Sequence, residues 1–93
     1  MKKTVTTNHD RVETLAGLHR ASQSVIRKMN ERVEEKGSGL FVDKHQIYGI
    51  VAEELKELMD ALHGNDIDGM KRELKDIAVA AIWGIASIEE SEA

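Results

Sequence analysis

Apolar residues recur at helical spacing in three segments of this chain, and short glycine-containing breaks separate the segments. The first segment runs from about His9 to Lys36, and its apolar or small residues alternate in steps of three and four. This heptad-like pattern predicts a first helix over residues 9–36 that packs in a bundle, after an N-terminal tail of residues 1–8. We expect the histidine on this seam to be packed in the core rather than to bind a ligand. The seam consists of Val12, Leu15, His19, Ser22, Ile26, Met29 and Val33, and Leu18 and Val25 widen it.

The second segment begins with a capping signal. Asp43 followed by Gln46 resembles a capping box, and Gly64 stands where a glycine often ends a helix. The pattern predicts a second amphipathic helix over residues 44–63, with Glu53, Glu57 and Asp60 opposite its apolar side. The apolar side is formed by Ile47, Tyr48, Val51, Leu55, Leu58, Met59 and Leu62, with Ala52 at its edge.

The third segment predicts a helix over residues 66–89, with either Asn65 or Asp66 as its N-cap. Its second half, Ile77 to Ile88, carries no charge on any face. A surface helix of a small monomer normally has a polar side. We therefore expect another subunit to cover this stretch.

The composition supports an all-α domain. The chain has 93 residues, no proline and no cysteine, and its β-branched residues do not alternate with polar ones. Lack of proline favours long helices, and lack of cysteine excludes disulfides and thiolate metal sites. We expect one all-α domain of three main helices, small enough to need an oligomer for a sufficient core.

The balance of charged residues limits the classes of partner that the chain is expected to bind. Thirteen basic and 17 acidic residues give a net charge of −4, which disfavours binding to nucleic acid or to acidic membranes. The chain begins without an apolar signal segment, and its longest uncharged run, 12 residues, is too short to span a bilayer. We expect a cytoplasmic protein that binds any phosphorylated ligand through a metal ion.

Two pairs of acidic residues carry the candidate chemistry. Glu54 and Glu57 in the second helix, and Glu73 and Asp76 in the third, are each three residues apart, so both members of a pair can point at one spot. If the turn at residues 64–65 makes the helices antiparallel neighbours, four carboxylates meet. Such oxygen ligands select Mg²⁺ or Mn²⁺, and four of them suggest two or more ions. Two ions can activate water against a phosphate without a protein nucleophile.

The order Glu-Glu-x-x-Glu at residues 53–57, 15 further residues, then Glu-x-x-Asp at residues 73–76 resembles the MazG-like all-α nucleotide pyrophosphohydrolases. The resemblance covers residues 44 to about 88. It implies Mg²⁺-dependent cleavage of (deoxy)nucleoside triphosphates to monophosphate and pyrophosphate, in nucleotide-pool control or house-cleaning. It also implies a homodimer or a dimer-of-dimers tetramer whose helices interlock into four-helix bundles.

Carried over residue by residue, the resemblance makes Glu54, Glu57, Glu73 and Asp76 the Mg²⁺ ligands, with Mn²⁺ as a possible substitute. Glu53 lies about 100° from Glu54 on the helical wheel. We therefore expect Glu53 to hold a metal-bound water or to accept a proton from the attacking water. These five residues form the expected catalytic set.

Candidate substrate-binding residues lie near the acidic positions. Arg72 is the best candidate for a phosphate, since Lys56 and Lys75 are more ordinary partners for acids of their own helices. His45 could touch a ribose or base. Trp83, two turns after Asp76, could either stack on a base or pack in a subunit interface. Tyr48 could also reach the ligand, but we expect it to pack in the core.

Two other functions remain open. Acidic helix faces are usually solvated, so the chain could be a non-catalytic helical oligomeric interaction module with an acidic docking face for a basic partner. A metal-dependent hydrolase of another phosphoanhydride would use the same acidic residues. Stabilisation by metal and nucleotide together would distinguish an enzyme from a docking module.

Overall fold

The computed structural model describes residues 11–92, with side chains from residue 14 onward. Within this range the chain is all-helical and contains no strand, as predicted: α1 spans Arg11–Lys36, α2 spans Lys44–His63 and α3 spans Ile67–Glu92. The tail and the expected first residues of α1, His9 and Asp10, lie outside the described residues. Since α3 ends at Glu92, it is three residues longer at this end than the predicted limit, Glu89.

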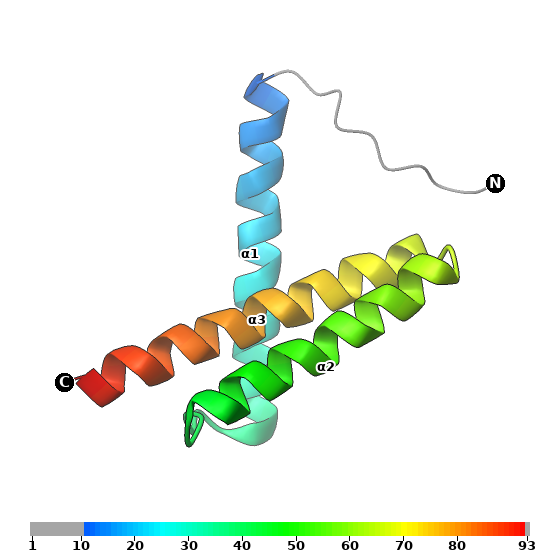
Figure 1. The fold of residues 1–93 in the computed structure, drawn as a ribbon. Helices are drawn as coiled ribbons and strands as arrows, with labels where there is room; N and C mark the ends of the chain where they lie inside the picture. Colours follow the sequence, from blue (N-terminus) through cyan, green and yellow to red (C-terminus); the bar gives the residue numbers. More distant parts are fainter. Residues whose placement is uncertain (1–10, 93) are drawn as a thin grey trace.

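α2 and α3 form an antiparallel hairpin and lie side by side along their length (Figure 1). The capping signal at the start of α2 is realised in the structure. The Asp43 carboxylate accepts a hydrogen bond from the Gln46 N–H at 2.9 Å, and the Gln46 side chain accepts one from the Val42 N–H at 2.6 Å. These bonds satisfy backbone donors that the first helical turn leaves unpaired.

The turn between α2 and α3 consists of residues 64–66. Gly64 has a φ of −84°, whereas Asn65 has a φ of 55°, so the asparagine adopts the left-handed conformation expected of the glycine. Asparagine tolerates this conformation better than most residues. Asp66 is the N-cap of α3, since its carboxylate accepts the Gly69 N–H at 2.8 Å.

The core of the hairpin is small. Val79 and Ala80 of α3 are the only buried apolar side chains in the described part of the chain. One turn further on, a Cβ atom added to Gly84 would lie 2.9 Å from the Ile47 Cγ2 atom. The absence of a side chain at Gly84 therefore lets α2 approach α3 closely.

α1 lies across α3 and packs on it, while it makes no comparable contact with α2 (Figure 1). Two hydrogen bonds tie the loop after α1 to α3, and a third, within α3, fixes the Ser87 hydroxyl. The Ser87 hydroxyl accepts the Phe41 N–H at 3.0 Å and donates to the Trp83 carbonyl at 2.7 Å, and the Trp83 indole N–H donates to the Gly39 carbonyl at 2.8 Å. The loop that follows α1 is therefore held beside the C-terminal half of α3.

Most of the expected apolar seam of α1 is exposed, and among its described residues only Met29 is half-buried. Leu15 and Ile26 are 57% and 41% exposed, and the seam histidine His19 is also exposed rather than packed in the core as expected. The half-buried residues on α1 include Ser24, Lys28 and Arg32, which follow one flank of the helix at intervals of four. Val25 and Met29 are half-buried as well, so α1 docks on α3 through polar and apolar residues together, and two of the polar ones, Lys28 and Arg32, pair with Asp76 of α3.

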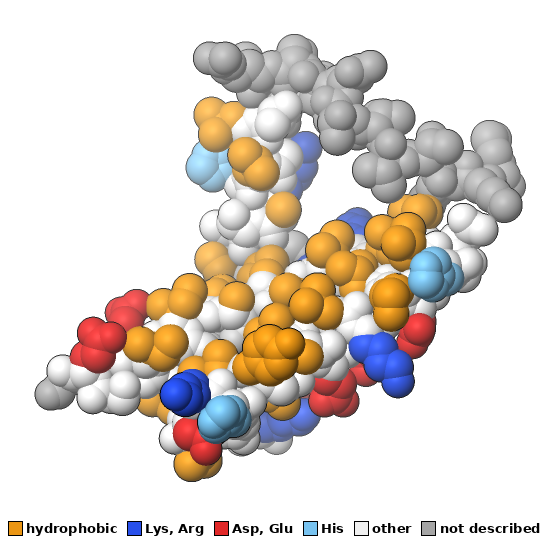
Figure 2. Space-filling model, viewed as in Figure 1, with side chains coloured by type: hydrophobic (Ala, Val, Ile, Leu, Met, Phe, Trp, Pro, Cys, Tyr) orange, Lys and Arg blue, Asp and Glu red, His pale blue; other side chains and the backbone are white. Residues whose placement is uncertain are grey.

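A large share of the apolar surface stays exposed in the single chain. Figure 2 shows apolar side chains gathered over one face of α2 and α3. The radius of gyration is 15.2 Å, whereas a compact domain of this length has about 12 Å. None of the helices within residues 11–92 is long and apolar enough to cross a membrane. The exposed residues on these two helices include Leu55, Met59, Leu62, Leu74, Ile82, Ile85 and Ile88.

Candidate functional site

The hairpin brings three carboxylates together. Glu54 and Glu57 lie one turn apart on α2, and antiparallel packing places Glu73 of α3 beside them. One oxygen atom from each carboxylate lies within 4.8 Å of the others, and we call these three residues the acidic cluster. Glu54 and Glu73 are half-buried, whereas Glu57 is exposed.

Burial and repulsion between neighbouring carboxylates disfavour the charged form of the acidic cluster. Burial, the hydrogen bond with Glu73 and the charges of Asp76, Glu57 and Glu73 raise the pKa of Glu54 from its ordinary 4.5 to about 7. The pKa of Glu57 is raised too, chiefly by its hydrogen bond with Glu73. One oxygen of Glu54 and one of Glu73 are buried without a hydrogen-bond partner among the described residues. Such buried carboxylate oxygens fit a hard divalent cation, which would supply the missing positive charge.

Asp76, the fourth expected metal ligand, forms ion pairs with two cations of α1. Its Oδ1 atom lies 2.6 Å from the Lys28 Nζ atom and 3.0 Å from an Arg32 guanidinium nitrogen, and its side chain is 11% exposed. Asp76 is near enough for its charge to raise the pKa of Glu54, but it does not belong to the acidic cluster. The structure thus brings three of the four acids together and pairs the fourth with α1.

The remaining expected residues of α2 do not belong to the acidic cluster. Glu53 is exposed and is not among the three clustered carboxylates. His45 is exposed at the start of α2. Tyr48 is 76% exposed, so the expected core packing is wrong for this chain. The reason is that α3 packs on the neighbouring side of α2, where Ile47 meets Gly84.

Arg72 and Trp83 lie close to acidic residues. The Arg72 Nε atom lies 3.8 Å from the Glu73 carboxylate, and the Arg72 side chain is 62% exposed. Trp83 lines a cavity of about 250 Å³ that also reaches Glu54 and Asp76. Phe41 and Ile50 add apolar walls, so this Trp83 cavity combines an aromatic surface with an acidic edge.

Sequence reasoning missed Lys28, Arg32 and Phe41. The spacing of Lys28 and Arg32, together with Ser24, offers a signal, because residues four apart share one flank of a helix. The apolar seam of α1 predicts a different packing side for this helix. Phe41 lies in a loop, where helical periodicity gives no guidance.

Taken together, the site offers a carboxylate cluster with buried unpartnered oxygens, an adjoining cavity with aromatic walls, and cations on neighbouring turns. Such a set can hold a divalent cation and a ligand that carries both an apolar ring and negative charge. Its chemistry is inferred from these residues alone. No model of a known protein family, no curated protein and no solved structure matches the chain.

Proposed function

We propose that this protein is a Mg²⁺-dependent nucleotide pyrophosphohydrolase that cleaves (deoxy)nucleoside triphosphates to monophosphate and pyrophosphate. The observation that carries the proposal is the acidic cluster, in which carboxylate oxygens from two helices lie within 4.8 Å of one another. Two of its oxygens are buried and unpartnered among the described residues, which a purely solvated acidic face would not require. The order and spacing of these acids, which resemble the MazG-like enzymes, add support.

In this proposal Glu54, Glu57 and Glu73 hold the metal, and Asp76 joins them as the fourth ligand. Bound Mg²⁺ or Mn²⁺ supplies positive charge to the phosphates and lowers the pKa of a bound water. Asp76 must then exchange at least part of its pairing with Lys28 and Arg32 for the metal. This exchange leaves the two cations of α1 beside the negatively charged ligand.

The other residues of the chain bind and orient the substrate. Glu53 is exposed one position before Glu54, where it can accept a proton from the attacking water. Arg72, on the turn of α3 that carries Glu73, contacts a phosphate. The Trp83 cavity takes the nucleoside, with the aromatic rings of Phe41 and Trp83 against the base.

The active form in this proposal is a homodimer or a dimer of dimers with interlocked helices. The small core, the extended shape and the exposed apolar residues of α2 and α3 all favour a second copy as the cover. The uncharged stretch from Ile77 to Ile88 contributes three of those residues. Light scattering at micromolar concentration tests this part, because a stable monomer would contradict it.

The test of the activity is incubation with Mg²⁺ and each common ribo- and deoxynucleoside triphosphate, followed by chromatographic separation of the products. Monophosphate and pyrophosphate in equal amounts are expected. Diphosphate with orthophosphate would place cleavage at the wrong bond. The Glu54→Gln/Glu73→Gln variant, which keeps side-chain size but removes two charges of the cluster, is the control for contaminating enzymes.

An interaction module without catalysis makes a different prediction for the same protein. Mg²⁺ and a non-hydrolysable nucleotide should together raise the melting temperature of an enzyme, because both bind only the folded chain. A docking module should show no such joint stabilisation. A hydrolase of another phosphoanhydride would show stabilisation but leave every nucleoside triphosphate uncleaved.

A further inference from the structure

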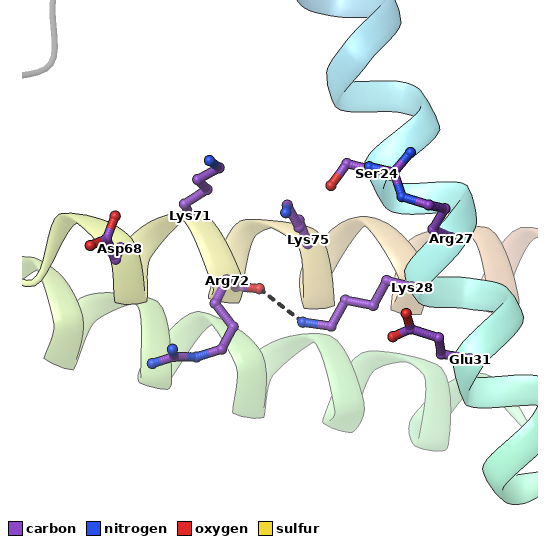
Figure 3. A pocket seen from close by; sticks show the side chains of 8 residues that line it. All are labelled: Ser24, Arg27, Lys28, Glu31, Asp68, Lys71, Arg72 and Lys75. Atoms are coloured by element: carbon purple, nitrogen blue, oxygen red, sulfur yellow. Dashed lines mark hydrogen bonds between the residues drawn. The ribbon is translucent and has the colours of Figure 1, made fainter.

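A second hollow lies between α1 and α3. It has a volume of about 460 Å³, and its lining is entirely polar or charged. Figure 3 shows Lys28 reaching from α1 to the Arg72 carbonyl of α3, to which it donates a hydrogen bond at 3.4 Å. Five basic residues line it against two acidic ones, and we call it the basic cleft: Arg27, Lys28, Lys71, Arg72 and Lys75.

Most of this positive charge is not neutralised by the described residues of the protein. Among the described residues, Arg27, Lys71 and Lys75 make no ion pair, and Lys75 is half-buried. Arg72 has only the Glu73 contact at 3.8 Å. The chain as a whole has a net charge of −4, so this concentration of cations is a local exception. A concave site with unneutralised cations attracts anions.

The lining also defines the kind of anion. None of the described residues that line the basic cleft is aromatic or a large aliphatic, which disfavours a nucleobase or an acyl chain there. Its volume lies in the range of small-molecule sites. Proteins that bind single-stranded nucleic acid combine a basic groove with aromatic stacking platforms, which this cleft lacks. A compact anion with several charges, such as an oligophosphate, fits these properties best.

The basic cleft borders the acidic site through two ion pairs. Lys28 lines the cleft and holds Asp76 at 2.6 Å, and Arg72 lines it and lies 3.8 Å from Glu73. An anion in the cleft would therefore lie next to the residues that we expect to bind metal. We propose that the basic cleft between α1 and α3 binds an oligophosphate group. If the proposed function holds, on which this part of the inference rests, the group is the β and γ phosphates of the nucleotide.

The experiment measures binding of inorganic tripolyphosphate to the full chain by isothermal titration calorimetry, in low salt and without divalent metal. Lys71→Gln/Lys75→Gln should weaken binding about tenfold or more, because it removes two cleft cations. The matched control, Lys44→Gln/Lys56→Gln, removes two exposed lysines of α2 that do not line the cleft. It should change the affinity by about twofold at most. Circular dichroism melts verify that both variants fold.

Three outcomes overturn the proposal: no binding at about 1 mM tripolyphosphate, equal losses in the two double variants, or single-stranded RNA binding about tenfold tighter than tripolyphosphate. The test is separable from that of the proposed function. Cleft-specific binding of tripolyphosphate without any triphosphate hydrolysis would refute the enzyme and support the cleft. Hydrolysis with an unchanged KM in Lys71→Gln/Lys75→Gln would support the enzyme and refute the cleft.

Discussion

The acidic residues on the two sides of α3 have opposite surroundings, because one meets carboxylates and the other meets cations. Toward α2, Glu73 meets Glu54 and Glu57, and burial together with the neighbouring carboxylates raises the pKa of Glu54 to about 7. Toward α1, Asp76 meets two cations at 2.6 and 3.0 Å. The acids of one sequence motif therefore have different roles in the metal-free protein. The acidic cluster is held together against repulsion, whereas Asp76 helps to hold α1 in place.

The largest effect is expected in the acidic cluster, where a substitution should remove activity without lowering the stability of the metal-free protein. Glu54→Gln should reduce kcat/KM for the preferred triphosphate about a thousandfold, because a lost metal ligand removes metal and substrate binding together. In the metal-free protein the same change removes repulsion, so the melting temperature should stay equal or rise by about 3 °C. Calorimetry without metal and a steady-state assay with Mg²⁺ measure the two effects. A large fall in melting temperature would mean that Glu54 stabilises the fold.

In contrast to Glu54→Gln, the Asp76→Asn change should destabilise the metal-free protein. The change leaves Lys28 and Arg32 without their shared anion, and we expect the free energy of unfolding to fall by about 1–3 kcal/mol, less than for a fully buried pair. Urea unfolding without metal measures this loss. Asp60→Asn, on the exposed side of α2, is the control and should have no measurable effect. Equal stability of the two variants would show that the ion pairs of Asp76 do not stabilise the fold, which would contradict the difference drawn between the two sides of α3.

Glu53 lies outside the acidic cluster and should behave as an outer-sphere residue. Glu53→Gln should lower kcat about tenfold while it leaves the apparent Mg²⁺ affinity nearly unchanged. Titration of activity with Mg²⁺ separates the two parameters. If the Mg²⁺ dependence shifts as strongly as in Glu57→Gln, Glu53 binds the metal directly.

The smallest expected effect is a pH dependence of metal-free stability. A carboxyl whose pKa is raised on folding binds a proton more tightly in the folded state, so its stabilising effect is complete below its unfolded pKa and is lost as the pH rises through its folded pKa. For Glu54 this window runs from 4.5 to about 7. The difference in melting temperature between Glu54→Gln and the natural protein should therefore grow as the pH rises from about 5 to about 8. A constant difference across this range would show that the pKa of Glu54 is not raised.

The helices could be predicted because their signals are local. Capping by Asp43 and the apolar periodicity of α2 depend on residues within a few turns, and the short turn at residues 64–66 makes the two acidic segments neighbours. Docking of α1 could not be predicted in this way. Periodicity shows which side of a helix is apolar, but not which partner covers it, and Ile26 remains exposed while Lys28 packs on α3. Spacing alone also treats the four acids as equivalent, because the cations that distinguish Asp76, Arg32 and Lys28, lie 44 and 48 residues earlier in the sequence, in α1.

The turn at residues 64–66 has a consequence for the rotational phase of the two helices. Asn65 reverses the chain and Asp66 starts α3, so together they fix which side of α3 faces α2. One residue inserted between Asp66 and Glu73 would advance the following part of α3 by about 1.5 Å and turn it by about 100°. Glu73 would then point away from Glu54 although every acid of the motif was still present. The number of residues between the two acidic segments is thus as much a part of this site as the carboxylates themselves.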